Sequence, residues 1–96
     1  MLSLLNLDKS KLIREYMKII TAEKLVPGSS AVITGISGDP LVRRRLMEMG
    51  VLPGSPLKLV RWAPLGDPVE CQIRGYKLSI RRTEAAMISV SLEGEE

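Results

Sequence analysis

Apolar and polar residues follow two different periods along the chain, and the change comes near Pro27. Between residues 8 and 25 the apolar positions recur at helical spacing, which is typical of an amphipathic helix. At about 100° per residue they share one face, which holds Leu12, Ile13, Tyr16, Met17, Ile19 and Ile20. Pro27-Gly28 ends any helix, because proline lacks the amide hydrogen and fixes its own backbone. The pattern therefore predicts an N-terminal helix near residues 9–22.

After Pro27 the chain changes to short runs in which apolar and polar residues alternate, as half-buried strands do. Turns rich in glycine and proline separate the runs. Five strands are predicted, at residues 31–36, 57–62, 69–74, 77–81 and 88–92. Gly75-Tyr76 fits the two central positions of a hairpin turn, with glycine first. The pattern predicts a mainly β fold, a small and strongly bent five-stranded barrel.

One short helix is predicted after the first strand, at residues 40–49. Asp39 suits the N-cap, Pro40 the first helical position, and Gly50 the left-handed position after the helix. The stripe expected to face the barrel consists of Val42, Leu46 and Met49. The positions expected to face away are Arg43, Arg44, Met47 and Glu48, with Arg45 at the border. Three consecutive arginines on a helix point in three directions, so they do not form one continuous basic edge.

The composition indicates one ordinary globular domain, because 96 residues, of which 45% are hydrophobic, leave no room for two cores. The formal net charge is +3, and an acidic tail with Glu93, Glu95 and Glu96 lowers it. Without these three residues, 14 cations face 8 carboxylates, a charge of +6 that favours anionic partners. No stretch approaches the ~18 apolar residues of a membrane span. The N-terminus lacks a signal-peptide pattern and there is one cysteine, so we expect a soluble, cytoplasmic protein.

Several short motifs follow one another in a characteristic order, namely Arg45-Leu46, Met49-Gly50, Pro53-Gly54, Gly66-x-Pro68, Gly75, Ile80-Arg81, Ala85-Ala86 and Ile88-x-Val90. With this order and spacing, the chain from Leu25 to Leu92 resembles the FeoA family, ferrous iron transport protein A, whose domain is a small SH3-like barrel. The resemblance implies an FeoA-type SH3-like barrel with a short acidic tail at residues 25–96, and the helical period before it predicts a helical extension at residues 1–24. Residues 1–20 extend beyond the usual start of the family's domain.

The resemblance also implies a function, that of a small cytosolic accessory protein in a ferrous iron uptake system. The implied partner is FeoB, a membrane permease with a cytosolic GTP-binding domain. A related barrel ends iron-dependent transcriptional repressors, but no helix-turn-helix pattern precedes the barrel in this chain. We therefore expect a protein-interaction module. Its N-terminal helix either packs on its own barrel or serves association with another copy or a partner.

The residues offer little chemistry of their own. Histidine is absent, and no glycine pattern matches a phosphate-binding loop. Cys71 alternates inward with Val69 and Ile73, so we interpret it as a small core residue rather than a nucleophile. Transition metals favour imidazole, thiolate and clustered carboxylates, and Asp67 with Glu70 makes only a weak pair. We predict no enzyme, no cofactor, no small-molecule substrate and no metal site, with direct metal binding or sensing as an alternative.

Two kinds of macromolecule are candidate partners for the basic surface, a nucleic acid and another protein. Nucleic acid is the alternative reading, since SH3-like barrels can bind it and a sizeable basic set is present: Arg43, Arg44, Lys58, Arg61, Arg74, Lys77, Arg81 and Arg82. Single-strand binding also needs stacking platforms, for which Trp62 and Tyr76 are the candidates. We favour docking on an acidic patch of the permease. The predicted partner-binding residues are Arg43, Arg44 and Met47, where two arginines flank a flexible apolar side chain.

Overall fold

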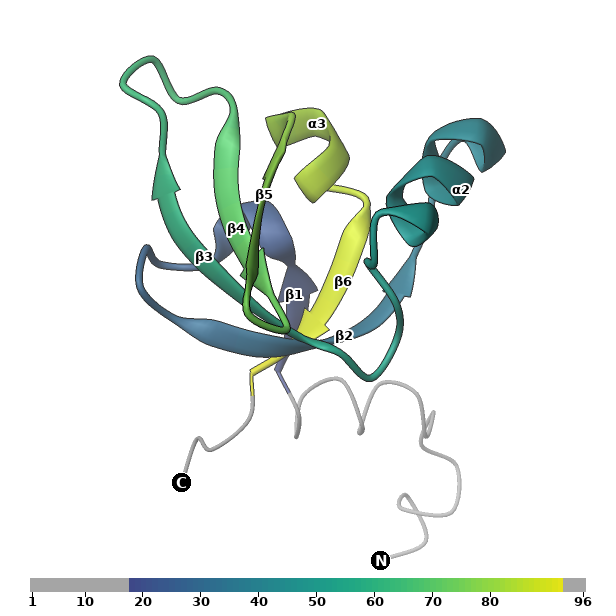
Figure 1. Ribbon diagram of the computed structural model, residues 1–96. Coiled ribbons are helices and arrows are strands. Elements are labelled where there is room, and N and C mark those ends of the chain that lie inside the picture. Colours follow the sequence, from purple (N-terminus) through teal and green to yellow (C-terminus); the bar gives the residue numbers. More distant parts are fainter. Residues whose placement is uncertain (1–17, 93–96) are drawn as a thin grey trace, which may run out of the picture.

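The computed structural model describes residues 18–92, in which six antiparallel strands form one strongly curved sheet (Figure 1). The strands are β1 (Ile19–Thr21), β2 (Ser30–Ile36), β3 (Pro56–Trp62), β4 (Val69–Ile73), β5 (Tyr76–Ile80) and β6 (Ile88–Ser91). Their order across the sheet is β1-β6-β2-β3-β4-β5. The helical segments are the 3₁₀ helix η2 (Ala22–Lys24) and the α-helices α2 (Pro40–Glu48) and α3 (Arg82–Ala85). The predicted mainly β fold with a helix after strand β2 is confirmed.

Two irregularities in strand pairing help the sheet to bend around one core. The register shifts between Ile33 and Gly35 in β2, and again between Leu59 and Arg61 in β3. An unpaired residue in one strand bends that strand and increases the local twist. The buried apolar residues form one aliphatic cluster: Ala22, Leu25, Ala31, Ile33, Leu46, Val51, Leu57, Leu59, Val69, Cys71, Ile73, Ile80, Ala85, Ile88 and Val90.

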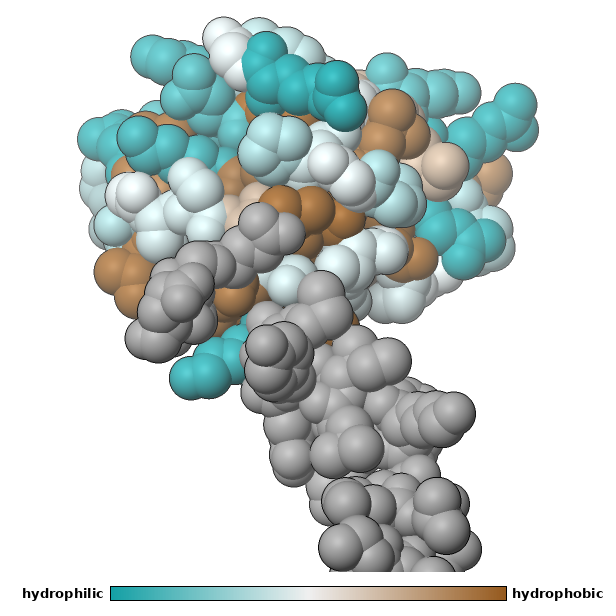
Figure 2. Space-filling view, turned by 90° about the horizontal axis from the view of Figure 1, so that it is seen from below, coloured by the Kyte–Doolittle hydropathy of each residue, from teal (hydrophilic) through white to brown (hydrophobic). Residues whose placement is uncertain are grey.

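The two ends of the curved sheet are built from different elements. Helices α2 and α3 lie at one end, and the described chain begins and ends at the other (Figure 1). There the amide of Leu92 donates to the carbonyl of Lys18 at 3.4 Å. Seen from that end, apolar patches lie between hydrophilic side chains (Figure 2). Apolar surface distributed in this way is ordinary for a globular domain.

The sheet contains six strands, whereas the alternation of the sequence predicted five. The additional strand is β1, which pairs with β6 so that Ile20 lies opposite Val90. Three residues are too few for a period of two to be recognised, and Ile19 and Ile20 also fit the apolar face of a helix. Their β-branched side chains suit a strand, and pairing with β6 decides the outcome.

The helix predicted near residues 9–22 falls mostly outside the described residues. From Ile19 onward the chain is not α-helical, because β1 and the three-residue η2 occupy this stretch. Ala22 and Leu25 are buried in the core cluster, so the sheet and core of the barrel begin before residue 25. The division into an extension at 1–24 and a barrel at 25–96 stays a prediction.

The hairpin turn between β4 and β5 lies one residue earlier than predicted. Ile73 pairs with Tyr76, so the turn residues are Arg74 and Gly75. Their φ angles are 50° and 91°, and two positive φ angles are what a type I′ turn requires. Arginine rarely adopts this conformation. Here its Nε donates a hydrogen bond of 3.0 Å to Oγ of Ser55, the residue that directly precedes β3, and this bond holds the arginine side chain.

Candidate functional site

Helix α2 begins at the signals that the sequence contains. The Oδ1 atom of Asp39 accepts a hydrogen bond of 2.8 Å from the Leu41 amide and caps the helix. Pro40 occupies the first turn, where its missing amide hydrogen costs nothing. The helix predicted at residues 40–49 is thus confirmed, with bounds Pro40–Glu48.

The C-terminal end of α2 closes in a Schellman arrangement. The amide of Val51 donates to the carbonyl of Leu46, and the amide of Gly50 donates to that of Met47, both at 3.0 Å. These two bonds satisfy carbonyls that would otherwise lack partners at the helix end. Gly50 has a φ of 102°, the left-handed conformation that glycine adopts without strain. Leu46 and Val51 are both completely buried, so this turn is anchored in the core.

A tyrosine from the β4–β5 hairpin also holds this helix end. The hydroxyl of Tyr76 donates a hydrogen bond of 2.5 Å to the Met49 carbonyl. It lies so close that a Cβ atom added to Gly50 would be 1.9 Å from the Tyr76 oxygen. Glycine at this position is therefore required twice, by its φ angle and by the close approach of Tyr76.

An ion pair fixes α2 to α3. Arg45 Nη2 contacts Glu84 Oε2, and the exposed fractions of the two side chains are 55% and 9%. The other oxygen of Glu84 accepts a hydrogen bond of 2.9 Å from the Arg81 amide at the start of α3. Both oxygens of this nearly buried carboxylate are thus paired, as burial of a charge demands. The helical period predicts Arg45 only at the border of the helix, and no local pattern pairs it with Glu84, thirty-nine residues later.

The faces of α2 agree with the helical period. Leu46 is completely buried, while Val42 and Met49 are partly buried and pack against the core. The four positions predicted to face away are all exposed: Arg43, Arg44, Met47 and Glu48. The predicted partner-binding residues thus lie together on the outer side of one helix.

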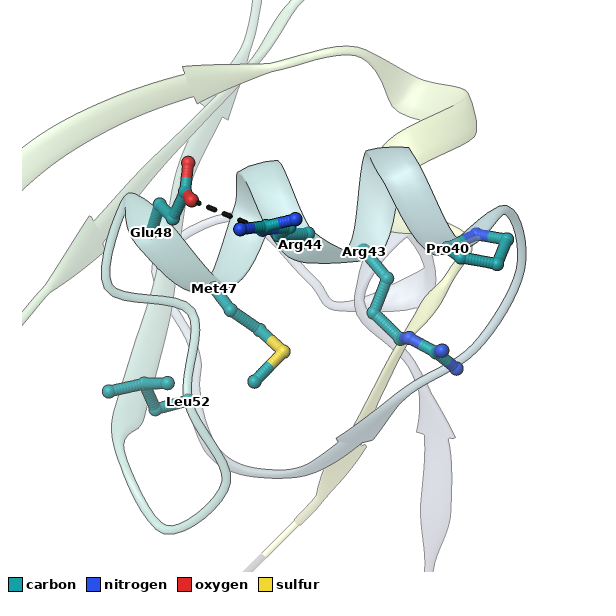
Figure 3. A pocket seen from close by; sticks show the side chains of 6 residues that line it. All are labelled: Pro40, Arg43, Arg44, Met47, Glu48 and Leu52. Carbon is teal, nitrogen blue, oxygen red and sulfur yellow. Dashed lines mark ion pairs between the residues drawn. The ribbon is translucent and has the colours of Figure 1, made fainter.

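A groove of about 570 Å³ runs along this outer side (Figure 3). It is lined by Pro40, Arg43, Arg44, Met47, Glu48 and Leu52. Leu52 comes from the turn after α2, so the helical period gives no signal for its place in the groove. The exposed large apolar residues of the described chain are Val26, Leu41, Met47, Leu52, Trp62, Leu65 and Tyr76. Three of these seven, Leu41, Met47 and Leu52, belong to α2 or to the turn that follows it.

The side chains of the groove form a charged part and an apolar part. In Figure 3 the Met47 side chain extends from the helix toward the side where Leu52 lies, and Arg43 extends on the same side nearer Pro40. Met47 and Leu52 are 42% and 41% exposed, so apolar surface is accessible between them. Together they offer an apolar contact beside an arginine.

The surroundings of Cys71 agree with the prediction that it is a small core residue rather than a nucleophile. Cys71 is 1% exposed, and burial raises the pKa of its thiol from 9.0 to about 11. Asp67 Oδ1 accepts a bond of 2.9 Å from the Arg82 amide, and Glu70 Oε1 lies 3.2 Å from Arg61 Nε. Within residues 18–92, no group of three or more potential metal ligands lies together.

Several of the basic and aromatic side chains predicted for nucleic acid have partners within the described part of the chain. All eight cations predicted for that role are exposed, but several are engaged within the barrel. Arg61 pairs with Glu70, and the Arg82 guanidinium lies 5.1 Å from the Trp62 ring centroid. The other predicted stacking residue, Tyr76, uses its hydroxyl on the end of α2.

The fold and groove define a class, a small SH3-like barrel that presents a rigid helix at one end. A Stenotrophomonas maltophilia FeoA complexed with zinc, described as a prokaryotic SH3 domain protein, is 27% identical with a TM-score of 0.65, covering 74% of this chain and 88% of that one. The FeoA protein of Chlorobium tepidum is 40% identical with a TM-score of 0.75, covering 80% of this chain and 73% of that one. The FeoA domain family matches residues 21–92, and this chain belongs to it.

One relative joins this type of domain to a transporter. The Fe(2+) transport protein A/Fe(2+) transporter FeoB fusion protein of Porphyromonas gingivalis is 42% identical over 69 residues. The match covers 72% of this chain and 8% of that relative's length. The FeoA family is a non-enzymatic accessory family of ferrous iron transport, which agrees with the prediction that the chain is not an enzyme. None of the helices within residues 18–92 is long and apolar enough to cross a membrane.

Proposed function

We propose that this chain is a cytoplasmic accessory protein of ferrous iron uptake that docks on the cytosolic side of a FeoB-type permease. The observation that carries the proposal is the Porphyromonas gingivalis relative, in which protein A and the FeoB transporter form one chain. Fusion holds two domains at an effective concentration of about millimolar, an arrangement that favours domains acting on each other. A separate chain of the same family would reach that contact through its own surface.

The outer face of α2 is the proposed docking surface, with Arg43, Arg44 and Met47 as its partner-binding residues. Three observations support it: Met47 and Leu52 are apolar and accessible, arginines border them, and two side-chain contacts fix the C-terminal half of the helix to the barrel. A rigid surface loses little conformational entropy on binding. Arginine and adaptable apolar side chains are enriched at interface centres. The basic body of the chain would suit an acidic patch on the permease.

A double variant tests this surface. Arg43→Glu with Met47→Asp should change the free energy of unfolding by under ~0.5 kcal/mol per exposed position. It should weaken binding to the purified cytosolic region of the organism's FeoB, measured by calorimetry, and lower ferrous iron uptake in cells. Lys77→Glu with Leu65→Asp is the matched control, since it makes the same changes at exposed positions outside the groove. Equal binding by both double variants would exclude this face, and no binding by the wild type would exclude docking on FeoB.

Direct metal binding is the second candidate function, favoured by the zinc complex of the Stenotrophomonas maltophilia protein. The donor set of this chain fits it poorly, because histidine is absent and Cys71 is buried with a raised pKa. We expect ferrous iron to bind no more tightly than about micromolar. Anaerobic calorimetry checks this, and tight stoichiometric binding that Cys71→Ser abolishes would favour a metal site instead.

A further inference from the structure

The two arginines of the groove differ in their ion pairing. Arg44 Nε lies 3.5 Å from Glu48 Oε2, and both side chains are mostly exposed, at 79% and 68%. This pair four residues apart balances the Arg44 charge within the helix. Arg43 has no ion-pair partner among residues 18–92. Asp39 lies one turn before Arg43, but it caps the helix through the Leu41 amide and does not line the groove. One guanidinium of the groove is thus left to receive an anion.

The two ends of the groove differ in chemistry. Arg43 and Met47 are four residues apart on α2, so they share a face and lie about 6 Å apart along the helix axis. Met47 and Leu52 form the apolar end (Figure 3). Glu48 follows Met47 on the helix, but its carboxylate pairs with Arg44 and points away from Met47 and Leu52 (Figure 3). An occupant with its anion at Arg43 and its apolar group at Met47 satisfies both ends.

We infer that the groove binds an acidic peptide segment, with a carboxylate on Arg43 and an aliphatic side chain between Met47 and Leu52. The helix positions of Arg43 and Met47 are about 6 Å apart along the axis, which sets the approximate spacing. The inference rests on the proposed function only for placing that segment in the permease. Residues i and i+4 of a helix meet the spacing, with Cβ atoms about 5–6 Å apart. Residues i and i+2 of a strand, at about 3.3 Å per residue, meet it as well. Guanidinium and carboxylate match in a bidentate pair.

The same features favour a peptide over a nucleic acid. A phosphate could pair with Arg43, but the continuing sugar-phosphate backbone carries no aliphatic side chain for the apolar end of the groove. It would therefore leave the apolar surface of Met47 and Leu52 uncovered. An aliphatic side chain removes that surface from water, and the flexible Met47 adapts to its shape. Tyr76 and Glu84 hold the helix on the barrel. Binding of a peptide therefore restricts mainly the side chains that line the groove.

A peptide selection tests the inference without using FeoB. A library of random peptides of about ten residues is selected on the full chain, and the pool is counter-selected on the Arg43→Gln variant. Selected peptides should pair Asp or Glu with Leu, Ile or Val at separations of two, three or four residues. For a synthetic copy of the strongest peptide, Arg43→Gln should weaken binding about tenfold or more in calorimetry, as expected for a charged hydrogen bond. Leu52→Ser should weaken it to a similar degree.

Two variants serve as matched controls. Lys77→Gln removes a positive charge from an exposed position outside the groove and should weaken binding less than about threefold, because salt screens a distant surface charge. Leu65→Ser removes an aliphatic side chain that is 96% exposed outside the groove and should have no effect.

Several results would overturn the inference: a selection that yields no peptide, peptides without acidic residues, or equal losses for Arg43→Gln and Lys77→Gln. Displacement of the peptide by single-stranded DNA at about 150 mM salt, with the same dependence on Arg43, would replace it with nucleic-acid binding. The proposed function fails separately. If Arg43→Gln leaves FeoB binding unchanged, the permease is not the source of the peptide and Arg43 is not part of the docking surface, but docking on FeoB stands. If the chain binds acidic peptides but not FeoB, then FeoB is not the partner, but the peptide inference stands.

Discussion

Replacing Gly50 by alanine perturbs the point where α2 meets the β4–β5 hairpin. Gly50 has a φ of 102°, which an L-residue rarely adopts. The new Cβ atom would lie 1.9 Å from the Tyr76 hydroxyl oxygen and 3.2 Å from its Cζ. The ring must therefore move, and it then loses the hydrogen bond of 2.5 Å to the Met49 carbonyl.

Two costs add in this variant. A non-glycine residue held at such a φ angle costs about 1–3 kcal/mol, and the lost hydrogen bond costs about 0.5–1.5 kcal/mol. We expect the free energy of unfolding to fall by about 1.5–4.5 kcal/mol in total. For a domain of this size, the melting temperature should fall by at least about 6 °C.

Urea unfolding followed by Trp62 fluorescence measures these costs. Gly28→Ala is the control, because Gly28 has a similar φ of 92° but no atom within 4 Å of the added Cβ. In a Tyr76→Phe background the hydroxyl and its hydrogen bond are already gone, so Gly50→Ala should cost about 1 kcal/mol less than in the wild type. The reasoning is refuted if Gly50→Ala costs no more than Gly28→Ala, or if its cost is the same in both backgrounds.

Three further predictions concern side chains and surface. Arg45→Gln leaves the carboxylate of Glu84 buried without its cation and should cost about 1–3 kcal/mol in urea unfolding, whereas Arg44→Gln breaks only an exposed pair and should cost under about 0.5 kcal/mol. Cys71 should react slowly with a thiol reagent at pH 8 until the protein unfolds. Because folding raises the pKa of this thiol from 9.0 to about 11, its contribution to the free energy of unfolding is fully present below pH 9 and is lost between pH 9 and 11. Random RNA should bind only at low salt, with a steep salt dependence in filter binding, and submicromolar binding at about 150 mM salt would contradict this.

Strand β4 shows what the sequence could predict. Val69, Cys71 and Ile73 alternate with polar residues, and the structure buries all three. Each such position is decided locally, by the period of the strand and the side that faces the core. The adjoining turn was misplaced by one residue, because Gly75 suits either central position of a two-residue turn. The left-handed conformation of Arg74 settles the register, and its support from Ser55 comes from a residue distant in the chain.

Strand β1 and the groove show what the sequence could not predict. Residues Ile19–Thr21 form a strand because β6, some seventy residues later, offers a free edge. The outward side of α2 follows from helical periodicity alone, so Arg43 and Met47 were predictable as exposed. Leu52 belongs to the groove only because the Gly50 turn folds the chain back beside the helix. Contacts of this kind depend on the finished fold, and local periods carry no signal for them.

The position of α2 therefore depends on residues that do not line the groove. Tyr76 holds the end of the helix, and Glu84 holds its inner side through an arginine thirty-nine residues earlier in the chain. Changes at these two positions should alter both stability and docking, because they move the helix. Changes at Arg43 or Met47 should alter docking alone, because these side chains are exposed and do not support the fold. A comparison of stability and affinity across both groups would separate residues that contact the partner from residues that position the helix.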